Sequence, residues 1–190
     1  MKQLLCALTL AASLGLPGPA LAGVMTFDDP GVVEIDNDTG VATYTEGGFK
    51  LSGQAASFLT ISNVLLGFAD APLSFKSRLG SPFTLLSLDY GFFDLGAGET
   101  PGALTVMGLV SGVTVVSQVL PLGALAHFNF GSLWANLSEV TFTATSAFVL
   151  DNISTVPEPG SLALAMLAMA AIAAMATSPG LGTATRRRAM

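Results

Sequence analysis

Short apolar or alternating segments recur from residue 23 to residue 155, and each is bounded by Gly, Pro, Asn, Asp or Ser. Alternation with a period of two predicts strands that bury one face, and this stretch has no comparable helical periodicity. We therefore expect an all-β body, with strands at 24–28, 41–45, 48–52, 56–61, 64–68, 83–93, 103–109, 113–120, 126–130, 137–143 and 147–155.

Turn residues separate the expected strands, most clearly at 37–40 and 96–102. Gly supplies positive φ angles there, and Asn or Asp side chains bond the local backbone. Residues 23–155 are enough chain for one domain with its own core. This many short strands predicts a two-sheet β-sandwich. A jelly-roll arrangement of the strands is the more specific prediction, and other kinds of sandwich are the alternative.

The N-terminus has the pattern of a secretory signal peptide. Lys2 precedes an apolar run at 4–16, and a small-x-small sequence ends at Ala22, which predicts a signal peptide over residues 1–22. Cys6 is the only cysteine and would be removed with the peptide. The mature protein would then have no thiol, which excludes disulfides, a catalytic cysteine and cysteine metal sites.

The C-terminal residues 156–190 contain three unlike pieces in order. A Pro-Glu-Pro motif comes first, then an uncharged, alanine-rich segment at 161–178, then an arginine cluster. As a helix, this segment would extend roughly 27 Å, just under a hydrocarbon core of about 30 Å, so we expect a marginal transmembrane helix with the arginines on the cytoplasmic side. The motif consists of Val156, Pro157, Glu158 and Pro159, and the cluster of Arg186, Arg187 and Arg188.

This order of motif, short hydrophobic helix and arginine cluster resembles the PEP-CTERM sorting signal of Gram-negative bacteria. The resemblance implies that an exosortase-type membrane protease recognises the motif and processes the protein. It also implies export across the inner membrane, a transient stay in that membrane, and a final place at the cell surface or outside the cell. Taken singly, the motif is also compatible with an ordinary linker and the helix with a permanent anchor.

The body is strongly acidic. Lys50, Lys76 and Arg78 are its only cations between residues 23 and 155, against twelve acidic residues, which leaves a net charge of −9. Phosphate backbones require many Lys and Arg side chains, so we exclude nucleic acid as a partner. The simplest explanation of such an acidic surface is that it keeps the protein soluble. An acidic surface also attracts divalent cations.

Three aspartates near the two ends of the body suggest a metal site. If the first and last strands lie side by side, Asp28, Asp29 and Asp151 converge, and their mutual repulsion favours a bound cation. A structural Ca²⁺ fits best, because calcium takes carboxylate, carbonyl and water oxygens. Adjacent strand residues point to opposite faces, which limits Asp28 and Asp29 to one contribution from a regular strand. The alternative is a simple turn at 28–31 and a solvated strand end at Asp151.

No motif for catalysis occurs in the chain. There is no G-x-S-x-G, H-E-x-x-H or phosphate-binding glycine loop, and no pair of carboxylates is singled out for glycoside hydrolysis. His127, the only histidine, is expected on a sandwich face or edge. Trp134 is either a flat ligand platform for sugars or a ring that closes one end of the core. We therefore expect that the protein is not an enzyme.

The predicted function follows from the ends more than from the body. The PEP-CTERM resemblance implies an exported structural or adhesive protein of a biofilm, surface layer or extracellular matrix. The alternative is a carbohydrate-binding module that acts on an extracellular polysaccharide. Residues 26–29 resemble the opening strand of carbohydrate-binding-module-like jelly rolls, and residues 147–153 resemble their last strand.

Overall fold

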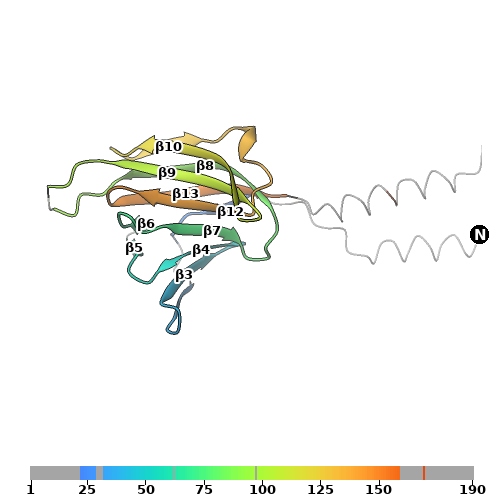
Figure 1. Cartoon of the computed structure of the whole chain (residues 1–190), viewed down its shortest axis with the longest axis horizontal. Helices are drawn as coiled ribbons and strands as arrows, with labels where there is room; N and C mark the ends of the chain where they lie inside the picture. The colour runs from blue at the N-terminus through green and yellow to red at the C-terminus, as the bar shows by residue number, and fades with distance from the viewer. Residues whose placement is uncertain (1–21, 29–31, 62, 97, 159–168, 170–190) are drawn as a thin grey trace, which may run out of the picture. The chain divides into compact units, whose positions relative to one another are not determined.

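The computed structural model describes residues 22–28, 32–61, 63–96, 98–158 and 169. Contacts divide the chain into two units, Met1–Glu158 and Pro159–Met190. The first unit is a sandwich of two antiparallel sheets, which confirms the all-β, two-sheet prediction (Figure 1). The narrower jelly-roll description stays a prediction. The strands of the described residues are β1 (Gly23–Met25), β2 (Val32–Asp36), β3 (Val41–Glu46), β4 (Phe49–Gln54), β5 (Phe58–Ile61), β6 (Val64–Gly67), β7 (Leu73–Ser77), β8 (Phe83–Phe92), β9 (Ala103–Val110), β10 (Val113–Pro121), β11 (Ala126–Asn129), β12 (Glu139–Ala144) and β13 (Phe148–Pro157).

Sheet A has the strand order β11-β8-β13-β6-β5, and β1 pairs with the later part of β13. Met25 lies opposite Ile153, so the first and last strands are neighbours, as the sequence predicts. Near Asn152 the alternation of inward and outward side chains along β13 is interrupted. Asn152 has a positive φ of 47°, and the pairing of β13 with β8 has a bulge at this point. The added residue lets Leu150 and Ile153 both point into the core.

Sheet B has the order β10-β9-β12-β7-β4-β3-β2. Its central strands alternate strictly between buried and half-exposed residues, for example along β7 and β12. Alternation puts every second side chain in the core and leaves the others on the outer face. The outer face of sheet B is therefore formed by every second residue of its central strands.

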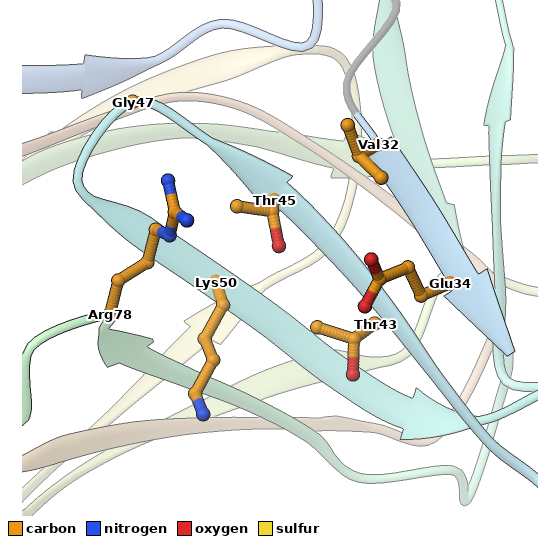
Figure 2. A pocket seen from close by; sticks show the side chains of 7 residues that line it. All are labelled: Val32, Glu34, Thr43, Thr45, Gly47, Lys50 and Arg78. Carbon is orange, nitrogen blue, oxygen red and sulfur yellow. The ribbon is translucent and has the colours of Figure 1, made fainter. Parts of the chain in front are cut away.

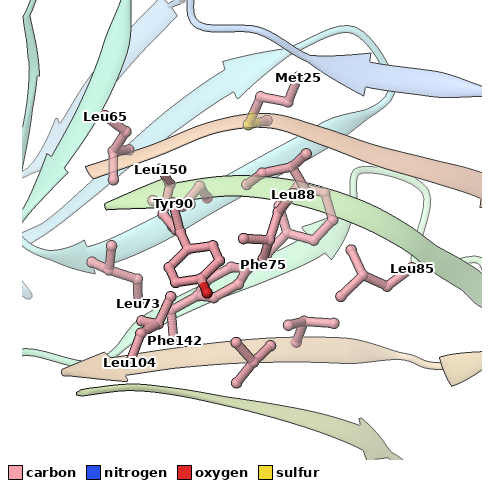
Figure 3. Packing of buried hydrophobic residues seen from close by; sticks show 14 of the residues in the cluster. Met25, Leu65, Leu73, Phe75, Leu85, Leu88, Tyr90, Leu104, Phe142 and Leu150 are labelled. Atoms are coloured by element: carbon pink, nitrogen blue, oxygen red, sulfur yellow. The ribbon is translucent and has the colours of Figure 1, made fainter. Parts of the chain in front are cut away.

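The core lies between the two sheets and consists almost entirely of aliphatic and aromatic side chains (Figure 3). The rings of Phe49 and Phe75 on sheet B stack at 5.1 Å, and Phe83 of sheet A meets Phe75 edge-on at 5.5 Å. Each such ring contributes about 1.5–3 kcal/mol through burial. Gly67 is required by close packing, because a Cβ there would overlap the ring of Phe148. The two sheets are thus joined by apolar contacts.

Two strands were not predicted. β2 is exposed along its whole length, so burial gives its sequence no alternating pattern. β7 alternates clearly but is only five residues long and follows directly after a proline, which made it resemble a loop. β7 matters most, because it lies in the middle of sheet B between β4 and β12.

The two chain ends are largely beyond what the structure describes. The expected signal peptide up to residue 21, the helix at 161–178 apart from Met169, and the arginine cluster Arg186, Arg187 and Arg188 all lie outside the described residues. Within the described part, no helix has the length and apolarity needed to cross a membrane. The signal peptide, the transmembrane helix and the sorting signal stay predictions.

Candidate functional site

The outer face of sheet B carries a continuous layer of hydroxyl, amide and charged side chains. They come from the half-exposed positions of four adjacent strands, β3, β4, β7 and β12. Thr43, Ser52, Ser74 and Thr141 form one row across these strands. The Thr43 and Ser52 hydroxyls lie 3.2 Å apart and share a hydrogen bond.

A second row on the same face holds cations. Lys50 on β4 lies directly opposite Lys76 on β7, and Arg78 follows immediately after β7. Like charges directly opposite each other on paired strands are unfavourable by a few tenths to about 1 kcal/mol. These three residues are also the only Lys or Arg side chains between residues 23 and 155. Positive charge is therefore concentrated in one place on an acidic body.

Only one of these cations is neutralised within the fold. Lys76 Nζ pairs with Glu139 Oε2 at 3.0 Å, and the Ser74 hydroxyl donates to Glu139 Oε1 at 2.6 Å. In the part of the chain that the structure describes, Lys50 and Arg78 form no ion pair. Their charges are left available to a ligand.

Two adjoining hollows open on this face. The first, of about 520 Å³, lies between β2 and the β3–β4 turn and is drawn in Figure 2. Lys50 and Arg78 border it on one side, and Glu34 on β2 stands on the other. The second, of about 500 Å³, lies over β4, β7 and β12 and also includes Lys50. The full lining is Val32, Glu34, Thr43, Thr45, Gly47, Lys50 and Arg78 for the first, and Val41, Lys50, Ser52, Gly53, Gln54, Pro72, Leu73, Ser74, Lys76, Glu139 and Thr141 for the second.

One hydroxyl in the second hollow has no partner. Thr141 Oγ1 is buried, and no hydrogen bond to it is made by the residues described. A buried hydroxyl without a partner is costly by about 1–3 kcal/mol. A ligand that entered the hollow and bonded Thr141 would remove that cost.

The outer face of sheet A has a different polar network. His127 on β11 and Asp89 on β8 are directly opposite, and His127 Nδ1 donates to Asp89 Oδ1 at 2.5 Å. Asn152 Nδ2 donates to the other oxygen of Asp89 at 2.7 Å, and the Asn129 amide oxygen lies 3.3 Å from His127 Nε2. The bond to Asp89 is the main cause that raises the pKa of His127.

His127 lies on the edge strand of sheet A, and its side chain is 52% exposed, which agrees with the edge position expected from the sequence. Both partners of the ring accept hydrogen bonds, so a doubly protonated imidazole satisfies them together. When the ring is protonated it forms a surface ion pair with Asp89, and together with the bond from Asn152 this links β11, β8 and β13. The network gives the ring a structural role.

Asp151 lies among other acidic side chains near the end of the body. Burial raises the pKa of Asp151, the Asn152 N–H lowers it, and the charges of Asp89, Asp28 and Glu46 raise it again. The convergence of Asp28 and Asp151 on one site stays a prediction. Asp29 lies outside the described residues.

Glu46 was not singled out from the sequence, yet it holds the end of β1 in place. Its carboxylate accepts hydrogen bonds from the Thr26 and Phe27 N–H groups at 3.0 and 2.9 Å, and from the Tyr44 hydroxyl at 2.9 Å. No three His, Cys, Asp or Glu side chains in the described part are grouped so that they would hold a metal ion. The structural Ca²⁺ at Asp28, Asp29 and Asp151 stays a prediction.

Trp134 packs inside the sandwich. It ends a short 3₁₀ helix, Ser132–Trp134, is only 5% exposed, and lies 4.4 Å from the ring of Phe130. Of the two roles left open by the sequence, the structure places Trp134 in the core, and it offers no free face on which a sugar would stack. The residues that line the two hollows on sheet B include no aromatic side chain.

The start of the Pro-Glu-Pro motif belongs to the folded body. Val156 and Pro157 are the last residues of β13 and lie opposite Thr84 and Phe83. The Glu158 N–H donates to the Pro82 carbonyl at 2.9 Å, and its carboxylate accepts from the Thr84 hydroxyl. Pro159 is outside the described residues. The last strand therefore extends two residues beyond the bound of 155 that the sequence predicts, so that Val156 and Pro157 belong to β13 and Glu158 follows it.

The sequence shows that the body has three cations but does not show that they share one face. The spacing of Lys76 and Arg78 by two residues would indicate a shared face only if residues 73–77 were known to form a strand. The position of Lys50 beside them depends on the pairing of β4 with β7.

No family model matches the sequence, and no curated protein matches it. A CBM4 structure is similar, with a TM-score of 0.31 and 10% identity over 76% of this chain and 92% of that chain. A family 11 carbohydrate-binding module from Clostridium thermocellum, in complex with a beta-1,3-1,4-mixed-linked tetrasaccharide, gives a TM-score of 0.31 and 14% identity over 72% and 95%. The CBM22-1–GH10 modules of Clostridium thermocellum endo-1,4-beta-D-xylanase 10B, complexed with xylohexaose, give 0.29 and 12% over 77% and 26%. Likeness at this level carries no argument about function.

Proposed function

We propose that the body of this protein is a non-catalytic carbohydrate-binding module, which binds an extended polysaccharide along the outer face of sheet B. The observation that carries the proposal is the pair of adjoining hollows lined by Ser, Thr, Gln and Lys side chains. Ser and Thr hydroxyls both donate and accept hydrogen bonds, as sugar hydroxyls do. A concave surface with several convergent polar groups is the usual form of a ligand site.

The module is delivered to its place of action by the ends of the chain. The signal peptide at 1–22 exports it, and the PEP-CTERM signal at 156–190 holds it in the inner membrane until an exosortase-type protease processes it. The polysaccharide is then met at the cell surface or outside the cell, and neither nucleic acid nor a catalytic step is involved.

Binding is tested by titrating purified full-length protein with soluble polysaccharides, and Thr141→Val is the informative variant. It keeps the shape of the side chain but removes the buried hydroxyl that lacks a partner. We expect binding to weaken severalfold while the free energy of unfolding stays the same or rises by up to about 1 kcal/mol. The matched control is Thr143→Val, at the next outward position of β12 but outside both hollows. Unchanged affinity for every polysaccharide in the Thr141 variant would remove this face as the site.

A structural role is the second candidate, and the edge strand β10 favours it. β10 has no charged residue, and Val113, Val115 and Val119 are 66%, 55% and 57% exposed. An uncharged edge strand pairs readily with another chain. The bulge beside Val115 limits this pairing to the second half of the strand. Sedimentation of wild type against Val119→Lys tests it, since self-association through β10 would be lost in the variant.

A further inference from the structure

The charges on the outer face of sheet B narrow the class of polysaccharide. We infer that the ligand is an anionic polysaccharide, whose carboxylate or sulfate groups are held by Lys50 and Arg78, with Lys76 beside them. This inference rests on the proposed function and goes further, because hydroxyl groups alone would recognise neutral chains equally well.

The first support is the segregation of charge. Residues 23–155 have three cations and twelve acidic residues, yet all three cations lie together at β4 and the end of β7. Solubility does not explain this, since an acidic body remains soluble wherever its few cations are placed. A binding site for a negative group does explain it, because the local positive field then attracts the ligand.

The second support is the geometry of the cations. Lys50 and Lys76 are cross-strand neighbours, and the carboxylate of Glu139 neutralises only Lys76. In Figure 2 the side chains of Lys50 and Arg78 stand beside the same hollow, with Thr45 next to them. A guanidinium fork binds carboxylate and sulfate through two parallel hydrogen bonds, and an ammonium adds a point charge.

Glu34 makes the charge of the first hollow asymmetric, with a negative side and a positive side. It lies on β2, across the hollow from Lys50 and Arg78. A negative group would be repelled at the β2 side and drawn toward β4 and β7. We therefore expect the anionic groups over Lys50 and Arg78, and the hydroxyl groups of neighbouring sugars along the row of Thr43, Ser52 and Thr141.

A polysaccharide fits this face better than a nucleic acid does. DNA and RNA carry a phosphate at every nucleotide and gain affinity from many Lys and Arg contacts. Here only three cations lie in a body with a net charge of −9, which is too few to supply those contacts. A sugar chain places carboxylates over the cations and covers the rest of the face with hydroxyl groups.

The experiment compares four probes in titrations of full-length protein: polygalacturonate, its fully methyl-esterified form, a neutral mixed-linked β-glucan and single-stranded DNA. We expect binding to polygalacturonate to be at least tenfold tighter than to the esterified polymer, and to weaken as salt concentration rises. Lys50→Gln and Arg78→Gln should each reduce affinity for polygalacturonate about tenfold and leave any binding of neutral glucan unchanged.

The control variant is Thr100→Asp, which changes the net charge by the same amount on an exposed loop outside the face. Equal binding of the esterified and acidic polymers would overturn the anionic class while the proposed function stands. Absence of binding to all three polysaccharides would overturn both. If single-stranded DNA binds as tightly as polygalacturonate, the proposed ligand is wrong and a nucleic acid becomes the better candidate. Thermal unfolding of each variant shows whether a loss of affinity reflects a loss of fold.

Discussion

The outer faces of the two sheets differ in how many of their polar groups have partners within the fold. On sheet A, Asp89 is bonded by His127 and Asn152, so its polar groups are satisfied by one another across β11, β8 and β13. On sheet B, Lys50 and Arg78 have no carboxylate partner in the described residues, and the Thr141 hydroxyl is unbonded. The network on sheet A is bonded internally, whereas Lys50, Arg78 and the Thr141 hydroxyl on sheet B have no such partner among the described residues.

The difference shows how polar groups on similar strands acquire different roles. A satisfied network stabilises the fold, while unpartnered groups cost stability unless something binds them. Changes on sheet B should therefore alter binding with little effect on stability, and changes on sheet A should do the reverse. The predictions below test that division.

The largest effect is expected from reversing charge on sheet B. In Lys50→Glu/Arg78→Glu, two charge-assisted contacts are replaced by repulsion, so affinity for an anionic polysaccharide should fall more than about 100-fold. The free energy of unfolding should change by less than about 1 kcal/mol, because neither cation forms an ion pair with a residue that the structure describes. Titration and urea unfolding measure the two quantities. A large loss of stability with retained binding would contradict the division between the faces.

On sheet A, Asp89→Ala should lower the free energy of unfolding by about 1–2 kcal/mol, since the bonds from His127 and Asn152 are lost together. Polysaccharide affinity should stay within twofold of wild type. Glu99→Ala, on the exposed loop between β8 and β9, is the control and should leave urea unfolding unchanged. If both variants unfold alike, the network contributes nothing to stability.

Asp151→Asn is a smaller change on the same side of the sandwich. Burial and the charges of Asp89, Asp28 and Glu46 raise the pKa of Asp151, so its ionised form destabilises the folded state above that pKa. The variant should gain up to about 0.5 kcal/mol at pH 7, given that the side chain is largely solvated. The gain should disappear as the pH falls below 3.8, the ordinary value.

Bound calcium would make the ionised form of Asp151 stabilising, so Asp151→Asn would then lose stability instead of gaining it. The same variant therefore tests the metal site. If Asp28, Asp29 and Asp151 hold Ca²⁺, millimolar calcium should raise the melting temperature of wild type but not of Asp151→Asn. Melting curves that are identical with calcium and with chelator in wild type would remove the site.

The smallest effect concerns His127. Its pKa is raised by Asp89, so the stability that it contributes is fully present below the unfolded value near 6.5 and is lost as the pH rises through the folded pKa. His127 is the only histidine, so a single ring resonance in an NMR titration reports on it. That resonance should titrate above pH 6.5 in wild type and return toward 6.5 in Asp89→Ala.

Much of the fold was accessible from the sequence, because the signals that specify strands are local. Alternation at Val140 and Phe142 predicted a half-buried strand, and both residues are fully buried in β12. The same reasoning missed β2, where neither face is buried and no alternation is imposed. The adjacency of the first and last strands was predicted from the closeness of domain ends and is confirmed by the pairing of Met25 with Ile153.

The sequence by itself determined that the body is all-β, that it is acidic with three cations, and which residues of a strand share one face. Period-two alternation specifies the face of a residue within its own strand, but it contains no information about which strand lies beside it. Only the tertiary structure paired β4 with β7 and so placed Lys50 opposite Lys76, and only the pairing of β11 with β8 gave His127 its partner Asp89. The role of Trp134 is also determined by the tertiary structure. Its burial depends on contacts with Phe130 and the sheets, which no local sequence pattern encodes.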